Sequence, residues 1–153
     1  MSSKNKVNDK VKNPKSDYPE LRVKSSTENL VRIREFVNNS ARKFGISEEI
    51  VGSLVLAVDE ASSNIIRHAY KNQPDGEITV VLFVEDNQCT IVLTDHGVGF
   101  NPDQVRTPDM VAYLKEKKRG GLGIHLMKKL MDEVDYHSVT GEYNKLVLRK
   151  KIA

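Results

Sequence analysis

Three clusters of residues in this 153-residue chain could do chemistry. In the first cluster Glu60, Asn64 and His68 follow one another at steps of four, so they fall on one face of a helix. A carboxylate beside a carboxamide offers the oxygen ligands that Mg²⁺ prefers, with water and phosphate oxygens completing its coordination. A solvated helix face would show the same spacing, so the stripe alone leaves both interpretations open.

The second cluster lies where an apolar strand ends, at residues 93–100, and consists of Asp95 followed by Gly97 and Gly99. Glycines permit a positive φ and a close approach of backbone to a ligand, while Asp95 supplies a hydrogen-bond acceptor. The alternative is a glycine turn that only leads the chain out of the strand.

The third cluster is glycine-rich, with Arg119 followed by Gly120, Gly121 and Gly123. These glycines lead directly into an apolar helical segment. Free backbone N–H groups and the positive end of a helix form a natural seat for phosphate. A flexible glycine hinge is the other interpretation of this segment.

Standard nucleotide and metal motifs do not match the chain. No G-x-x-x-x-G-K-[ST] sequence is present, and Pro102 spoils a G-x-G-x-x-G match that begins at Gly97. The H-R-D and D-F-G sequences of eukaryotic-type protein kinases are missing too. His96 and His137 have no metal-ligand spacing to each other, and we expect His125 to be a packing or surface residue.

The elements that must position these clusters follow from hydrophobic periodicity and turn residues. In chain order, we expect a strand at 18–24, helices at 27–44 and 47–68, strands at 77–85 and 88–95, a helix after 123, and strands at 134–138 and 145–152. Continuously apolar strand centres suggest strands covered on both faces or nearly so. The expected fold is α+β, a two-layer sandwich whose helices cover one face of a mixed, mostly antiparallel sheet.

The helix ends carry recognisable signals. Thr27 and Ser47 are the expected N-caps, and Gly45 occupies the position at which a glycine commonly ends a helix. The apolar stripe of the first helix is expected to run from Leu30 to Phe44.

Composition points to a soluble cytoplasmic protein. Hydrophobic residues make up 39% of the chain and charged residues 29%. The longest unbroken apolar runs, of which Val80 to Val84 is one, are far shorter than the about 20 residues of a membrane span. No secretory signal is visible. The single cysteine, Cys89, excludes an internal disulfide and a cysteine-based zinc site.

Positive charge is concentrated at the amino terminus. Residues 1–24 hold seven Lys or Arg and three Asp or Glu, which leaves a net charge of −1 on the remainder of a chain whose total is +3. We expect residues 1–16 to be a disordered basic tail and residues 17–153 to form one domain. Nucleic acid is not an expected partner, because no recognition motif accompanies the charge.

Taken in order, the three clusters resemble the boxes of the GHKL ATPase superfamily. Glu60–Asn64 resembles its N box, residues 95–99 its G1 box and residues 121–123 its G2 box. The joint match is far more specific than any one box, and it implies the Bergerat fold. Within the superfamily, the tracts DEASSNIIRHAY and GGLGIHLMKKLMDEV resemble anti-sigma-factor serine kinases of the RsbW type.

The resemblance implies a role for each residue of the N and G1 boxes. Asn64 would bind a Mg²⁺ ion that bridges the ATP phosphates, and Glu60 would be the general base for a serine hydroxyl. Asp95 would accept a hydrogen bond from the adenine amino group, with Gly97 and Gly99 letting the base approach.

It implies roles for the third cluster too. Gly121, Leu122 and Gly123 would wrap the phosphates, and Arg119 would lie near the γ-phosphate. Residues 101–119 would form the ATP lid.

The implied activity is that of a Mg²⁺- and ATP-dependent protein serine/threonine kinase. Such a protein phosphorylates a STAS-type anti-sigma-factor antagonist and, as a homodimer, sequesters a sigma factor. The alternative is a nucleotide-gated protein-interaction module without kinase activity, because nucleotide binding alone can order a lid and control a partner surface.

Overall fold

The computed structural model describes residues 18–98 and 123–152. The elements in chain order are β1 (Glu20–Lys24), the 3-10 helix η1 (Thr27–Asn29), α2 (Leu30–Lys43), α3 (Glu48–Asn64), the π-helix η2 (Ile65–Ala69), β2 (Glu77–Glu85), β3 (Gln88–Asp95), α5 (Gly123–Leu130), β4 (Glu133–Val139) and β5 (Tyr143–Lys151). The predicted order of strands and helices is confirmed. The expected tail (1–16) and ATP lid (101–119) lie outside the described residues.

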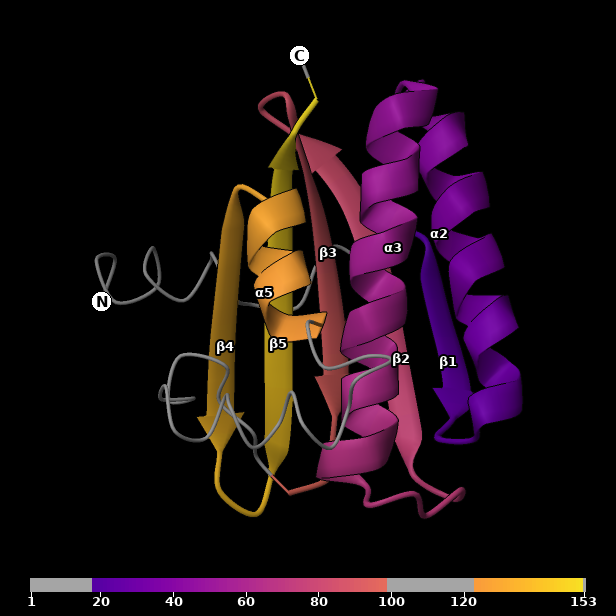
Figure 1. Ribbon diagram of the computed structural model, residues 1–153, viewed down its shortest axis with the longest axis vertical. Coiled ribbons are helices and arrows are strands. Elements are labelled where there is room, and N and C mark those ends of the chain that lie inside the picture. The colour runs from indigo at the N-terminus through magenta and orange to yellow at the C-terminus, as the bar shows by residue number, and fades with distance from the viewer. Residues whose placement is uncertain (1–17, 99–122, 153) are drawn as a thin grey trace.

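The strands form one sheet in the order β1-β2-β3-β5-β4. Every pairing among the described strands is antiparallel, so this part of the sheet is not mixed. Helices α2, α3 and α5 all cover the same face (Figure 1). The predicted two-layer α+β sandwich is therefore confirmed, and the structure adds the strand order.

The hydrophobic core lies between the helices and the sheet. Helix α3 packs against α2 on one side and α5 on the other. Apolar side chains on the inner face of the helices and on alternate strand positions are buried; they include Ile33, Val37, Leu54, Val58, Ile78, Val80, Leu82, Ile91, Leu93, Met127 and Leu148. Burial of this surface from water is the main force that holds α3 in place.

The opposite face of the sheet has its own apolar row. Val81 pairs with Val92, and Val92 pairs with Val147, so the three side chains lie side by side across the central strands. All three are buried, although no helix among the described residues covers this face. The continuously apolar strand centres thus correspond to strands with buried residues on both faces.

Local turn chemistry explains two connections. Asp86 and Asn87 join β2 to β3 with φ of 54° and 59°, the left-handed conformation of a tight hairpin turn. Gly45 follows the C-cap of α2 with φ of 77°, which a residue with a side chain rarely adopts.

Two predictions about the first helix are wrong. Thr27 is not an N-cap, because the chain first makes the 3-10 turn η1, closed by the Asn29 N–H donating to the Ser26 carbonyl at 2.9 Å. Phe44 does not join the buried stripe, since it caps the helix and is 41% exposed. Ser47 is the N-cap of α3, but its side chain makes no capping hydrogen bond.

No helix among the described residues is both long enough and apolar enough to cross a membrane.

Alanine substitutions of two leucines on α3, Leu54 and Leu56, test which face of the helix stabilises the fold. Leu54 is fully buried, whereas Leu56 is 44% exposed. We expect Leu54→Ala to lower the free energy of unfolding by about 2–5 kcal/mol through the cavity that it leaves. Leu56→Ala, the matched control, should lower it by less than about 1 kcal/mol in the same urea titration. Equal losses in the two variants would contradict the packing of α3 described above.

Candidate active site

The α-helical hydrogen bonding of α3 ends at Asn64, and the chain continues directly into the π-helical turn η2. The Tyr70 N–H donates to the Ile65 carbonyl five residues earlier, at 2.9 Å. Such turns are rare and occur frequently at functional sites. The predicted helix to about His68 is confirmed, and the turn sets the direction in which the side chains after Asn64 project.

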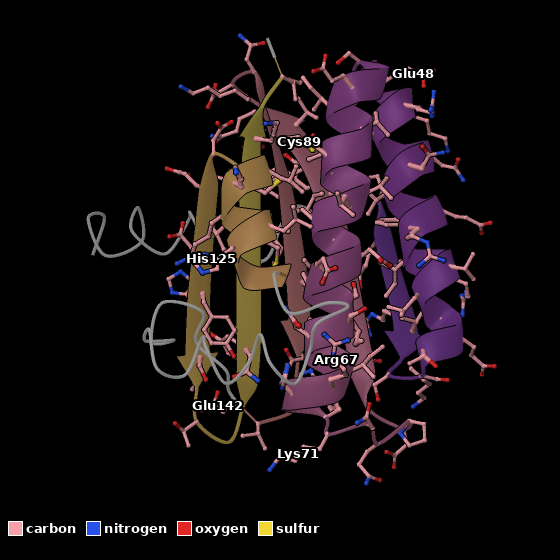
Figure 2. The ribbon with its side chains drawn as sticks, in the orientation of Figure 1. Glu48, Arg67, Lys71, Cys89, His125 and Glu142 are labelled. Atoms are coloured by element: carbon pink, nitrogen blue, oxygen red, sulfur yellow. The ribbon has the colours of Figure 1, made fainter. Side chains whose placement is uncertain are left out.

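The amide of Asn64 has a cationic neighbour. Arg67 donates from Nη2 to Asn64 Oδ1 at 3.2 Å. Asn64 is buried and Arg67 is half-buried. Figure 2 shows Arg67 near the lower end of the helix. The oxygen predicted to face a metal ion therefore already accepts a hydrogen bond from a positive group.

Glu60 lies one helical turn before Asn64 and is half-buried. Burial raises the pKa of its carboxyl, and the negative charge of Asp59 adds to that shift, while Arg67 opposes it. A carboxyl whose pKa is shifted upward is better matched to accepting and releasing a proton near neutral pH.

Asp95 closes strand β3 at the same end of the molecule as the end of α3 (Figure 1). Its side chain is only 3% exposed. The Gly97 N–H and Asn144 Nδ2 both donate to Oδ1, at 2.9 and 2.7 Å. Burial raises the pKa of Asp95, and these two donors and the neighbouring His96 oppose the increase.

Gly97 is required for close packing rather than for an unusual φ. A Cβ at this position would lie 2.3 Å from the Ala69 carbonyl oxygen. Its φ is not positive, so that part of the sequence argument is wrong. The next residue, Val98, donates its N–H to the same carbonyl at 2.7 Å. The loop after β3 is thus packed against the end of η2.

The hydroxyl group of Tyr70, which was not among the predicted site residues, holds this loop in place. Tyr70 donates to the Glu77 carbonyl at 2.6 Å and accepts from the His96 N–H at 2.7 Å. The Tyr70 ring also fills the space beside Gly76, because a Cβ added to Gly76 would lie 2.4 Å from the ring atom Cε1. Only the tyrosine's place at the end of the helix could have indicated this role. Asn144 and Arg67 were missed because their partners depend on sheet order and on the π-turn.

The structure brings Asn64 and Asp95 to one cavity of about 30 Å³ between α3, α5 and the sheet. That volume holds about one water molecule, so a nucleotide base requires these walls to separate. The lining residues are Ala61, Asn64, Ile65, Ala69, Asp95, Met127, Tyr136 and Leu146. A larger, open cavity of about 1010 Å³ adjoins it and shares Ala69 and Tyr136.

The third predicted cluster can be placed only in part. Gly123 begins α5, whose Met127 lines the small cavity. Gly99, Arg119, Gly121 and Leu122 lie outside the described residues.

Other side chains in the described part of the chain offer less chemistry. No group of three or more His, Cys, Asp or Glu there could hold a metal ion. His125 is exposed, as predicted for a surface residue (Figure 2). Burial raises the pKa of Cys89 to about 12, so its thiol is not ionised at neutral pH.

Known proteins are similar to this chain in sequence. The family model described as a histidine kinase-like ATPase domain matches residues 23–150. Serine-protein kinase RsbW of Bacillus subtilis strain 168 is 31% identical over 131 residues, covering 82% of this chain and 81% of that protein. Anti-sigma F factor of Clostridium acetobutylicum is 28% identical over 134 residues, covering 88% of this chain and 93% of that protein.

A solved structure is also similar. The crystal structure of the RsbU and RsbW domains of Rv1364c from Mycobacterium tuberculosis matches 88% of this chain with a TM-score of 0.63. The match covers 32% of that longer chain, and the sequence identity is 15%. This likeness therefore concerns the fold alone.

The packing at Gly97 can be tested with two glycine substitutions. Gly97→Ala places a Cβ against a backbone carbonyl and should lower the free energy of unfolding by about 1–3 kcal/mol. Gly52→Ala is the matched control, because no atom lies within 4 Å of its added Cβ and it sits inside α3, where alanine is preferred by about 0.5–1 kcal/mol. Urea unfolding that finds Gly97→Ala as stable as the wild type would contradict the close approach to Ala69.

Proposed function

The chain belongs to the histidine kinase-like ATPase family, and on that premise we propose that it is an ATP-binding serine-protein kinase that acts as an anti-sigma factor. The observation that carries this proposal is the meeting of Asn64 and Asp95 at one cavity between α3 and the sheet. Relatives named serine-protein kinase and anti-sigma F factor support the activity. We assign it to one domain, residues 17–153.

The purine base of ATP binds beside Asp95 in this proposal. The buried carboxylate accepts a hydrogen bond from the adenine amino group, because both oxygens of an ionised carboxylate are acceptors. Gly97, and Gly99 beyond the described residues, keep this edge of the site free of side chains. ADP binds in the same way.

Asn64 is the proposed Mg²⁺ ligand. Its Oδ1 is a neutral amide oxygen, and the hydrogen bond from Arg67 that it accepts in this structure would have to yield to the metal ion. Oxygen donors of this kind fit Mg²⁺, which usually keeps several waters and takes one or two protein ligands together with phosphate oxygens. When bound, Mg²⁺ would neutralise part of the phosphate charge.

The remaining phosphate contacts are proposed from the sequence pattern. Gly121, Leu122 and Gly123 would donate backbone N–H groups at the beginning of α5, where the helix dipole favours negative charge. Arg119 would offset the charge that spreads over the γ-phosphoryl oxygens during transfer. Residues 101–119 would form the lid.

Glu60 is the proposed general base. It accepts the proton of a serine hydroxyl while the serine oxygen forms a bond to the γ-phosphorus, and the bond from that phosphorus to ADP breaks. The carboxylate must be ionised to accept the proton. Transfer should therefore decline as the pH falls through the raised pKa of Glu60.

The proposed protein partners follow from the resemblance to anti-sigma-factor serine kinases, and the relatives named serine-protein kinase and anti-sigma F factor support them. A STAS-type antagonist supplies the serine, and a sigma factor is bound by a homodimer of the chain; both act in the cytoplasm, where we place this protein. The homodimer would be checked by sedimentation equilibrium. A strictly monomeric chain at micromolar concentration would remove the dimer and leave the nucleotide chemistry in place.

Glu60→Gln tests the base. We expect this variant to keep its affinity for ATP and to lose about 10²–10⁴-fold in the rate of phosphate transfer, because an amide cannot accept the proton. The assay follows labelled phosphate from ATP to a serine of a purified STAS-domain protein. Asp59→Asn is the matched control: it neutralises the adjacent carboxylate, whose partner is Arg34 at 2.7 Å, at a cost of about 0–1 kcal/mol of stability.

Transfer by Glu60→Gln at the wild-type rate would remove Glu60 from the base role. A wild-type chain that binds ATP but phosphorylates no STAS protein would favour the nucleotide-gated interaction module instead.

Asn64→Ala tests the metal ligand. Calorimetric titration with ATP, in Mg²⁺ and in EDTA, should show metal-dependent binding to the wild type that is lost in the variant. Asn39→Ala, on the exposed side of α2, is the control and should bind as the wild type does. Metal-dependent binding retained by Asn64→Ala would contradict the assignment.

A further inference from the structure

A second amide lies directly beside the carboxylate that is proposed to bind the base. Asn144 on β5 is 2% exposed. Its Nδ2 donates to Asp95 Oδ1 at 2.7 Å and to the Gly97 carbonyl at 3.0 Å. Its Oδ1 accepts from the Ser138 hydroxyl at 2.6 Å.

Strand register fixes this chain of contacts. Asp95 pairs directly with Asn144 across β3 and β5, and Asn144 pairs with Ser138 across β5 and β4. Directly opposite residues have their Cβ atoms about 4.5–5.5 Å apart on one face, which is close enough for short side chains to bond. The three side chains therefore form one row on the helix-covered face of the sheet.

The partners of Asn144 also fix which way its amide points. Reversing the amide would place its oxygen against two acceptors, the Asp95 carboxylate and the Gly97 carbonyl. In the orientation present, the donor faces both acceptors and the acceptor faces the Ser138 hydroxyl. Every polar atom of the amide head group is then used inside the protein, so Asn144 acts on a ligand only through Asp95.

The two oxygens of the Asp95 carboxylate differ in the hydrogen bonds that they accept from the described residues. Both hydrogen bonds to Asp95 from described residues end on Oδ1. Oδ2 accepts none from the described part of the chain, and the side chain lines the small cavity. Oδ2 is therefore the oxygen that the proposed site would offer to a base.

We propose that Asn144 is the positioning residue that keeps Asp95 in its acceptor form and thereby selects a 6-amino purine over a 6-oxo purine. This inference rests on the proposed nucleotide site at Asp95. An ionised carboxylate accepts from an exocyclic amino group and repels a 6-oxo group, since both are acceptors. A protonated carboxyl could instead donate to the 6-oxo group.

Among the residues that the structure describes, few groups act on the protonation of Asp95. Burial raises its pKa, and Asn144, the Gly97 N–H and the adjacent His96 lower it. Tyr70, at the end of η2, interacts electrostatically with it. The other residues that line the small cavity are Asn64 and the apolar or phenolic side chains of Ala61, Ile65, Ala69, Met127, Tyr136 and Leu146. Loss of the Asn144 donor should therefore raise the pKa of Asp95 further.

The test compares the full chain with Asn144→Leu, which keeps the shape of the side chain and removes its hydrogen bonds. Affinities for ADP and for inosine diphosphate, a 6-oxo analogue, are measured by calorimetry in Mg²⁺ from pH 5 to 8. In the variant we expect ADP affinity to fall about tenfold at pH 7. The pH at which ADP binding is half lost should rise, and the preference for ADP over inosine diphosphate should shrink.

Ser138→Ala keeps the fold of the amide's surroundings and removes only the bond that orients Asn144. Ser138→Ala should shift the pH midpoint of ADP binding and the preference for ADP over inosine diphosphate in the same directions, by smaller amounts. If Asn144→Leu does not fold, the measurements on Ser138→Ala decide the test. Thr94→Val is the matched control, because Thr94 precedes Asp95 on the opposite face of β3 and should change neither readout.

A merely structural role would lower affinity for both nucleotides without moving the pH midpoint or their ratio. A wild-type chain that selects ADP, together with Asn144→Leu or Ser138→Ala variants whose midpoint and preference are unchanged, would overturn the role of Asn144. A wild type that binds neither nucleotide would overturn the nucleotide site itself.

Discussion

The packing of α3 against the sheet is the constraint on which the rest of the structure depends. Leu54 and Val58 are fully buried, and Ala61 brings the helix backbone close to the strands at the end that carries chemistry. Because α3 runs toward the end where β3 finishes, hydrophobic burial brings Asn64 and Asp95 to the lining of one small cavity (Figure 1). Neither polar group could hold the helix there, since buried polar pairs contribute little net stability.

The same burial places the carboxyl groups of Glu60 and Asp95 beside different hydrogen-bonding and charged neighbours. Both Glu60 and Asp95 have raised pKa values because of desolvation. The positive charge of Arg67 opposes the shift at Glu60, whereas neutral donors, a backbone N–H and an amide, oppose it at Asp95 together with His96. A base must exchange its proton, and an acceptor must keep its lone pairs aimed at one place. Environments that differ in this way are how one site assigns different roles to the same functional group.

What could be predicted from sequence is what is encoded locally. The strands joined at Asp86 and Asn87 have the predicted bounds, because a tight turn between two continuously apolar runs is a property of adjacent residues. Residues Glu60 and Asn64 were identified from helical spacing for the same reason. Asn144 could not be identified, because its contact with Asp95 depends on β5 pairing with β3 across 49 residues. The 3-10 turn found in place of the predicted cap at Thr27 could not be predicted either, because residue propensities do not distinguish between such alternative local hydrogen bonds.

The π-turn and the loop after β3 behave as one unit, and this joins the two halves of the site. The Ala69 carbonyl accepts from Val98, and the Tyr70 hydroxyl holds the His96 N–H, so the loop cannot move without breaking bonds to the end of the helix. That loop also supplies the Gly97 N–H to Asp95. In the proposed nucleotide site, a base that shifted Asp95 would therefore strain the segment that holds Arg67 against Asn64. Backbone hydrogen bonds would then connect the proposed base-binding end with the proposed phosphate-binding end, in addition to the ligand itself.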